Sequence, residues 1–254
     1  MDKRYNLLGV SVSVTDVDRA YQTITRWIDR RDKQYICVCP VSTIVDCQKD
    51  ERYKTIVNHA GMVTPDGMPV MWMGRLKGHP DIRRTYGPDL MRTVCRLGQE
   101  RGIKHFFYGG TEETNARLVE QLKTEYPAIQ IAGSYAPPFL ACGELEKEVV
   151  LERIRQVRPD ILWIGLGSPK QDYWMANHRE RLDVPVLVGV GAAFDFLAGV
   201  KPQAPPWMQK SGLEWLFRLG SEPRRLWKRY LFGNTVFVFL ILKESFLALF
   251  KSHD

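Results

Sequence analysis

The sequence predicts an α/β fold in which a largely parallel sheet carries helices on both faces and is followed by a C-terminal helical appendage. Apolar, strand-like runs alternate with helical segments of about 10–15 residues, an order typical of parallel sheets. After Gly199 the composition changes to a proline-rich linker and then to basic and aromatic residues. We therefore expect a Rossmann-like domain over residues 1–200 and an appendage over residues 201–254.

Hydrophobic periodicity places the elements along the chain. Strands are expected at residues 7–14, 35–39, 62–64, 105–108, 129–134, 161–166 and 186–190. Helices are expected at residues 16–30, 112–126, 144–158 and 170–181, and another helix ends at Lys54 with Ser42 or Thr43 as its cap. The first strand and helix form a βα unit in this interpretation. An aromatic helix at residues 207–219 follows the linker.

The composition is that of an ordinary globular protein, with 44% hydrophobic and 26% charged residues. The five cysteines include no CxxC pair, and the first four residues do not lead into the apolar segment of a secretory signal. We therefore expect reduced cysteines in a cytosolic domain, with Cys37 and Cys39 pointing inward from a strand.

The charge indicates an anionic partner. The net charge of +7 would suit a nucleic acid, an acidic membrane or a phosphate-bearing substrate. In the appendage, basic residues are interleaved with aromatic ones, a pairing that suits either lipid headgroups or single-stranded nucleic acid. They are Arg218, Arg224, Arg225, Lys228 and Arg229, with Trp207, Trp215, Trp227 and Tyr230.

An apolar run at residues 236–242 favours lipid over nucleic acid. It is shorter than the roughly 20 residues that span a bilayer, so an interfacial helix is expected. The alternative is an aromatic helix packed on its own domain.

Three loops that follow strands could bind a ligand, because ligands of open parallel sheets bind at the carboxyl ends of the strands. The loop from Gly165 to Gln171 opens a helix whose free N–H groups could bind phosphate, although glycines after a strand also simply make a turn. Pro65-Asp66-Gly67 presents a carboxylate that could act as a general base, or is only a turn. Arg83 and Arg84 could clamp a phosphate, or are a solvated pair.

Other motifs are explained better by a structural role than by metal binding or cofactor binding. Asp16 and Asp18 match a metal-binding DxD pattern, but their place at a helix start favours a cap. The histidines have no HxxH or HExxH spacing, so no metal site is expected. Gly189 and Gly191 begin a dinucleotide-binding GxGxxG pattern that Phe194 breaks, which argues against an NAD-dependent oxidoreductase.

Taken together, several short motifs occur in a characteristic order. They are Pro65-Asp66-Gly67, Arg84 with Gly87-Pro88-Asp89-Leu90, Phe107-Tyr108-Gly109-Gly110, the loop Gly165–Gln171, Gly189–Phe196, Ala204–Gln209, and Gly212–Leu219 followed by Glu222–Leu226. Over nearly the whole chain, this order resembles the WecG/TagA/CpsF glycosyltransferase family. No single motif is as specific as the order and spacing of the set.

The resemblance implies an inverting, metal-independent transfer, without a cofactor, from a UDP-sugar such as UDP-N-acetylmannosamine to a sugar on undecaprenyl diphosphate. The reaction would belong to cell-surface polysaccharide assembly. The implied partners are the UDP-sugar donor, the polyprenyl-diphosphate-linked acceptor and the cytoplasmic face of the membrane, bound peripherally, and not nucleic acid. Whether the chain forms a homo-oligomer stays open, and the rival from another class is a membrane-docked nucleotide-binding or scaffold protein without turnover.

The resemblance also implies roles for individual residues. Asp66 matches the proposed base, Arg84 an arginine for a diphosphate, and Gln171 the glutamine of a Pro-Lys-Gln loop. The substrate-binding residues it implies are Gly110, Gly167, Lys170, Gly191, Asp195, Arg218, Arg225 and Lys228. The chain departs from the Thr-x-Asn segment of many members, because Cys37-Val38-Cys39-Pro40 stands there, and we expect Ser42 or Thr43 to substitute.

Overall fold

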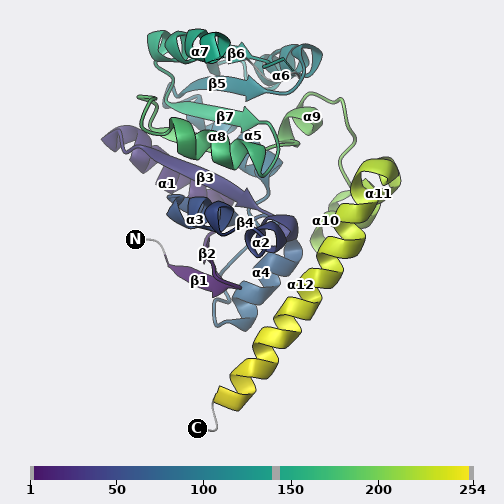
Figure 1. Ribbon diagram of the computed structural model, residues 1–254. Coiled ribbons are helices and arrows are strands. Elements are labelled where there is room, and N and C mark those ends of the chain that lie inside the picture. The colour runs from purple at the N-terminus through teal and green to yellow at the C-terminus, as the bar shows by residue number, and fades with distance from the viewer. Residues whose placement is uncertain (1–2, 139–143, 252–254) are drawn as a thin grey trace.

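A computed structural model describes residues 3–138 and 144–251 and has a six-stranded sheet at its centre (Figure 1). The strand order is β4-β3-β8-β7-β5-β6, and every neighbouring pair is parallel. The strands are β3 (Gln34–Cys39), β4 (Met62–Pro65), β5 (Lys104–Gly109), β6 (Gln130–Tyr135), β7 (Ile161–Gly165) and β8 (Val186–Gly189). The predicted α/β fold with a parallel sheet is confirmed.

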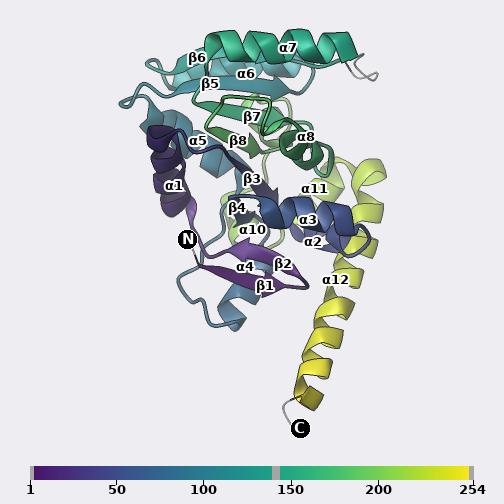
Figure 2. The ribbon, with the colours of Figure 1, turned by 60° about the vertical axis from the view of Figure 1, so that its left-hand side comes forward.

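Helices cover both faces of the sheet. Alternate strand residues point to opposite sides, so Ile36 and Trp163 belong to one core cluster, whereas Cys37 and Leu162 belong to the other. The first face carries α1 (Val17–Arg30), α5 (Gly87–Gly98), α6 (Glu112–Glu125) and α9 (Ala193–Leu197). The second carries α2 (Val41–Cys47), α3 (Glu51–His59), α7 (Glu144–Val157) and α8 (Lys170–His178). Figure 2 shows these layers from the side.

Residues 7–14 do not form a strand of this sheet, so the predicted first βα unit is wrong. They belong to a separate antiparallel hairpin of β1 (Arg4–Leu7) and β2 (Val10–Ser13). The chain reverses at Leu8 and Gly9, whose φ angles of 53° and 81° are those of a tight hairpin turn. The buried positions shift by one residue across this turn, from Tyr5 and Leu7 to Val10 and Val12, and the expectation of one continuous strand overlooked that shift.

The helical segment after β3 also differs from the prediction. It consists of two helices, and Ser42 and Thr43 lie inside the first turn of α2 instead of capping it. Asp50 caps α3, since its side chain accepts a hydrogen bond of 3.0 Å from the Tyr53 N–H. Two unpredicted helices, α4 (Met68–Leu76) and α5, each have a proline in the first turn, which fixes φ at a helical value.

The appendage has three helices, α10 (Pro206–Ser211), α11 (Glu214–Ser221) and α12 (Pro223–Lys251). A single helix over residues 207–219 was expected, but Gly212 takes a left-handed φ of 78° and ends α10. The C-terminal part of helix α12 extends away from the sheet (Figure 1).

The apolar run at residues 236–242 is therefore only part of one long helix. Residues 223–247 are long and apolar enough to cross a membrane by length and composition, and 6% of the most apolar window is buried in the protein. This differs from the expected short interfacial segment, because Leu226, Leu231 and Phe232 extend the apolar character toward the start of α12. The helix is thus able to associate with a membrane.

One buried histidine gives the fold a testable pH dependence. His105 in β5 accepts a hydrogen bond of 3.0 Å from Trp163 Nε1, and burial lowers the pKa of His105 to about 3. The unfolded chain binds this proton at about pH 6.5, so the free energy of unfolding should fall as the pH is lowered from there toward 3. Between these pH values, His105 alone should lower the free energy of unfolding by up to about 1.4 kcal/mol per pH unit.

Urea denaturation at pH 7 and pH 5 would measure this difference in stability. His105→Leu should be less stable than the wild type at pH 7 but should lose less stability between the two pH values. An equal loss in both proteins would refute the assignment.

Candidate active site

Two cavities adjoin at the carboxyl ends of β3, β4 and β8. The smaller, the strand-end pocket, has a volume of about 120 Å³ and lies beside the first turn of α8 and the start of α5. The larger, the appendage groove, has a volume of about 640 Å³ and lies between α4 and the appendage helices. Pro40, Asp66, Arg218 and Arg229 line both. Asp66 therefore stands where the two cavities meet.

Asp66 is held on the turn that follows β4. Its backbone N–H donates to the Cys39 carbonyl at 3.3 Å, and its Oδ1 accepts from the Gly87 N–H at the start of α5, also at 3.3 Å. Burial raises the pKa of Asp66, the positive charge of Arg84 opposes this, and the negative charge of Glu214 adds to it. A carboxylate with a raised pKa binds a proton more strongly, which suits a general base.

Arg84 connects this turn to the appendage. Its Nε donates to the backbone carbonyl of Asp66 at 2.5 Å, while its Nη2 donates to Glu214 of α11 at 2.5 Å. The guanidinium also stands 4.1 Å from the ring centre of Tyr86. Both side chains of the ion pair are largely buried, with 16% and 12% exposure. Arg84 thus positions the Asp66 turn and fastens α11 to it.

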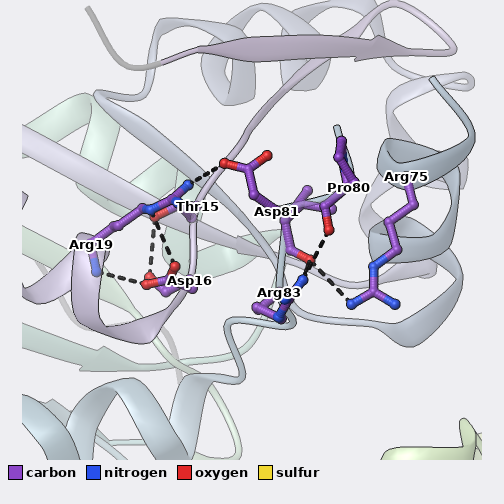
Figure 3. Close-up of polar contacts among 8 residues, drawn as sticks. Thr15, Asp16, Arg19, Arg75, Pro80, Asp81 and Arg83 are labelled. Atoms are coloured by element: carbon purple, nitrogen blue, oxygen red, sulfur yellow. Dashed lines mark hydrogen bonds and ion pairs between the residues drawn. The ribbon is translucent and has the colours of Figure 1, made fainter. Parts of the chain in front are cut away.

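Arg83 does not share this site, so the two arginines do not form a paired clamp. Its side chain donates to the Pro80 carbonyl at 2.9 Å, and its backbone N–H donates to Thr15 at 3.1 Å (Figure 3). The same loop is fastened by Arg19, which contacts Asp81 at 2.7 Å. These contacts hold the loop that carries Arg84 against the start of α1.

Three arginines of the appendage line the strand-end pocket. Arg218 makes no hydrogen bond or ion pair within the described residues, and its guanidinium stands 5.5 Å from the ring centre of Phe196. Arg225 is paired with Glu222, and Arg229 donates to the hydroxyl of Ser42. Sequence analysis counted Arg229 as a tail charge and missed it as a site residue.

The loop after β7 closes the other side of the strand-end pocket. Gly167 takes a φ of 77°, and its N–H donates to Gln171 Oε1 at 3.0 Å. The Gln171 amide in turn donates to the hydroxyl of Ser168 at 3.2 Å. Gly191 also lines the pocket, and a Cβ on it would approach Gln171 to 3.5 Å. The Gln171 side chain thus holds the shape of this loop, and the catalytic role that the family resemblance implies for Gln171 stays a prediction.

The structure does not bring five of the predicted site residues into either cavity. Thr43 lies on the buried side of α2, so only Ser42 of the two expected substitutes reaches a cavity. The Gly110 N–H donates to Gly165, Asp195 is paired with Lys201, and Lys228 stacks on Trp227. Lys170 is exposed. Their functional roles stay predictions.

The acidic pair at the start of α1, the potential metal ligands and the cysteines were also interpreted from the sequence. Asp16 accepts a hydrogen bond from the Arg19 N–H at 2.8 Å, which confirms the helix cap. No group of three or more potential metal ligands gathers within the part of the chain that the structure describes. Cysteines 37, 39, 47 and 95 are free and buried, as expected for Cys37 and Cys39, and Cys142 lies outside the described residues.

Sequence analysis missed two further groups. Glu214 lies within a motif that carried the family resemblance, but nothing local identifies it as the partner of Arg84. Asp172 of α8 is almost completely buried and accepts a hydrogen bond of 2.7 Å from the Tyr53 hydroxyl, which fixes the first turn of α8 next to the strand-end pocket.

Cavities at the carboxyl ends of a parallel sheet are the usual place of ligand-binding and catalytic sites in α/β enzymes. Comparison with known proteins identifies the kind of enzyme. The chain belongs to the glycosyl transferase WecG/TagA/CpsF family, whose model matches residues 5–249. The predicted family and glycosyltransferase activity are confirmed.

Curated relatives share a single activity name, N-acetylglucosaminyldiphosphoundecaprenol N-acetyl-beta-D-mannosaminyltransferase. The Bacillus subtilis (strain 168) protein is 28% identical over 241 residues, which cover 92% of this chain and 91% of the relative. The Bacillus spizizenii protein is 28% identical over 82% of this chain and 78% of its own length. The Staphylococcus aureus (strain MRSA252) protein is 28% identical over 77% of this chain and 74% of its own length.

The Arg84–Glu214 pair predicts how firmly the appendage is held. Glu214→Ala leaves a mostly buried guanidinium without its partner, so the free energy of unfolding should fall by about 2–4 kcal/mol. The linker before α10 should also be cleaved faster by a protease. Denaturation and limited proteolysis would measure both effects, with Glu113→Ala as the control because Glu113 pairs with the exposed Arg117 on α6. Equal effects of the two substitutions would contradict the prediction.

Proposed function

We propose that this glycosyltransferase moves N-acetylmannosamine or a related hexose from a UDP-sugar to a sugar on undecaprenyl diphosphate, with inversion, in cell-surface polysaccharide biosynthesis. The shared activity name of the relatives supports the acceptor and the sugar. The observation that carries the proposal is the place of Asp66 between two cavities of different character. One cavity then serves the donor and the other the acceptor.

The strand-end pocket suits the donor. It lies at the carboxyl ends of parallel strands, beside the N-terminus of α8, where the positive end of the helix dipole favours phosphate. Arg218 and Arg225 add positive charge, which would stabilise a diphosphate. Gly167 and Gly191 leave room for close approach of a ligand to the backbone.

The reaction then follows from the position of Asp66. The acceptor hydroxyl attacks the anomeric carbon, and Asp66 takes the proton of that hydroxyl. The bond between the anomeric carbon and the UDP oxygen breaks, and its electron pair leaves with UDP. Attack from the side opposite to UDP inverts the anomeric centre. The arginines stabilise the negative charge that develops on the leaving diphosphate.

The appendage, residues 201–254, would join the catalytic domain, residues 1–200, to the cytoplasmic face of the membrane as a peripheral anchor. Large apolar side chains on α12 are more than half exposed, among them Leu231, Phe239 and Leu242. Arginines and a lysine near the start of α12 suit anionic headgroups. Lys243 and Glu244 interrupt the apolar surface, which favours a helix lying at the interface.

Asp66→Asn tests the base assignment. The neutral amide cannot accept the hydroxyl proton, so kcat should fall by about 100- to 10,000-fold. Incubation with a lipid-diphosphate acceptor and a panel of UDP-sugars, scored by product mass and UDP release, would measure it. Asp183→Asn, at an exposed carboxylate far from the site, is the matched control and should keep full activity. Full transfer by Asp66→Asn would refute the assignment.

The environment of Asp66 also predicts the pH profile. Because burial raises the pKa of Asp66, the acid limb of kcat/KM should lie above the ordinary carboxylate range near pH 4. Glu214→Gln removes a negative charge that raises this pKa, so the limb should move to lower pH. Activity profiles of Glu214→Gln and of the control Glu222→Gln would decide the matter. If the acid limb of kcat/KM stayed in place, or moved equally in both variants, the proposed effect of Glu214 on the pKa of Asp66 would be contradicted.

A further inference from the structure

The appendage groove has a charged end and an apolar end. All of its charged lining residues gather around the position of Asp66: Asp66 itself, Arg84, Glu214, Arg218 and Arg229. The far end has only apolar lining, which comes from α4 and the middle of α12: Met73, Leu76, Val238, Ile241 and Leu242. Arg229 and Leu242 are thirteen residues apart on one helix, a distance of about 20 Å. The groove is therefore long and changes character along its length.

The apolar end of the groove is open, although Met73 and Ile241 in its lining also pack against the core. Trp72 of α4 is 43% exposed, Leu76 79%, and Leu242 of α12 64%. Exposed apolar side chains that face one another across a cavity of this size are typical of a binding site.

Two ion pairs join the groove's walls. The Arg84–Glu214 pair lies at the charged end, and Lys77 at the end of α4 contacts Glu244 of α12 at 3.3 Å. The second pair lies one residue beyond Leu76 and two beyond Leu242, so it follows the apolar lining on both walls. The Lys77–Glu244 pair thus joins α4 to α12 at the apolar end, and the Arg84–Glu214 pair joins the Asp66 turn to α11 at the charged end.

We propose that the appendage groove binds the isoprenoid chain next to the diphosphate of the lipid-linked acceptor. This inference rests on the proposed function, and it adds the subsite that recognises the lipid. A prenyl diphosphate matches the groove at both ends, since its phosphates would lie near Arg229 and its chain along α4 and α12. The acceptor sugar beyond the diphosphate would then reach Asp66.

The inference predicts that the enzyme recognises chain length without any membrane. Each buried methylene group should tighten binding about fourfold, until the groove is full. Acceptors of one sugar with a methyl, geranyl or farnesyl group on the diphosphate would be compared in detergent-free buffer. KM should fall at least tenfold from the methyl to the farnesyl acceptor, with a smaller change in kcat.

Two neighbouring residues of α12 provide a matched pair of variants. Val238 lines the groove and is 55% exposed, whereas Phe239 does not line it and is 64% exposed. Val238→Asp should raise KM for the farnesyl acceptor at least tenfold and leave KM for the methyl acceptor unchanged. Phe239→Asp places the same charge on the outer side of the same helix and should change neither. Equal effects of the two variants, or a KM independent of chain length, would overturn the inference.

Binding of farnesyl diphosphate, followed by tryptophan fluorescence, separates this inference from the proposed function. Trp72 and Trp215 line the groove and should report occupancy. Binding that Val238→Asp weakens, without sugar transfer to any acceptor, would leave the groove assignment standing and refute the proposed function. Farnesol binding as tightly as farnesyl diphosphate, or displacement of farnesyl diphosphate by phosphatidylglycerol vesicles, would overturn the groove assignment.

Discussion

The ion pair between Arg84 and Glu214 is the interaction on which the site depends. One guanidinium holds the carbonyl of the Asp66 turn with Nε and the carboxylate of α11 with Nη2. Both partners are largely buried, with 16% and 12% exposure, so the pair joins α11 to the turn that carries the base away from solvent. Both cavities have walls from the appendage, so both take their shape from this contact. The parallel sheet holds the Asp66 turn at the end of β4, and the Arg84–Glu214 pair fastens α11 to that turn.

The same pair balances the charge around the base. Arg84 and Arg218 would keep a neighbouring carboxylate ionised, whereas burial and Glu214 act in the opposite direction. A base that must both accept and release a proton works best when neither influence dominates. The arginine that orients the turn is therefore already neutralised by a partner, and Arg218, without such a partner among the described residues, is left to bind an anionic substrate.

Much of the fold could be predicted from local pattern, and the failures have physical causes. Alternating strands and helices indicated the parallel sheet, but the turn at Leu8 and Gly9 was missed because residues 7–10 contain no polar residue that would mark it. Asp66 and Gly167 were found because each follows a strand. Glu214 and Arg229 were not, since their roles depend on docking of the appendage, and Glu214 lies 130 residues from its partner. Contacts of that kind leave no periodic signal in the sequence.

The apolar lining of the appendage groove has a consequence for selectivity against water. Under the proposed function, a bound donor faces Asp66 from one cavity, and the other cavity is where any attacking hydroxyl must arrive. A groove walled by residues such as Met73 and Ile241 offers water few hydrogen-bonding partners. Once a lipid fills this groove, water is displaced from the path to Asp66, so hydrolysis of the donor is disfavoured while the acceptor is bound. The apolar lining thus limits hydrolysis of the donor sugar in addition to binding the lipid.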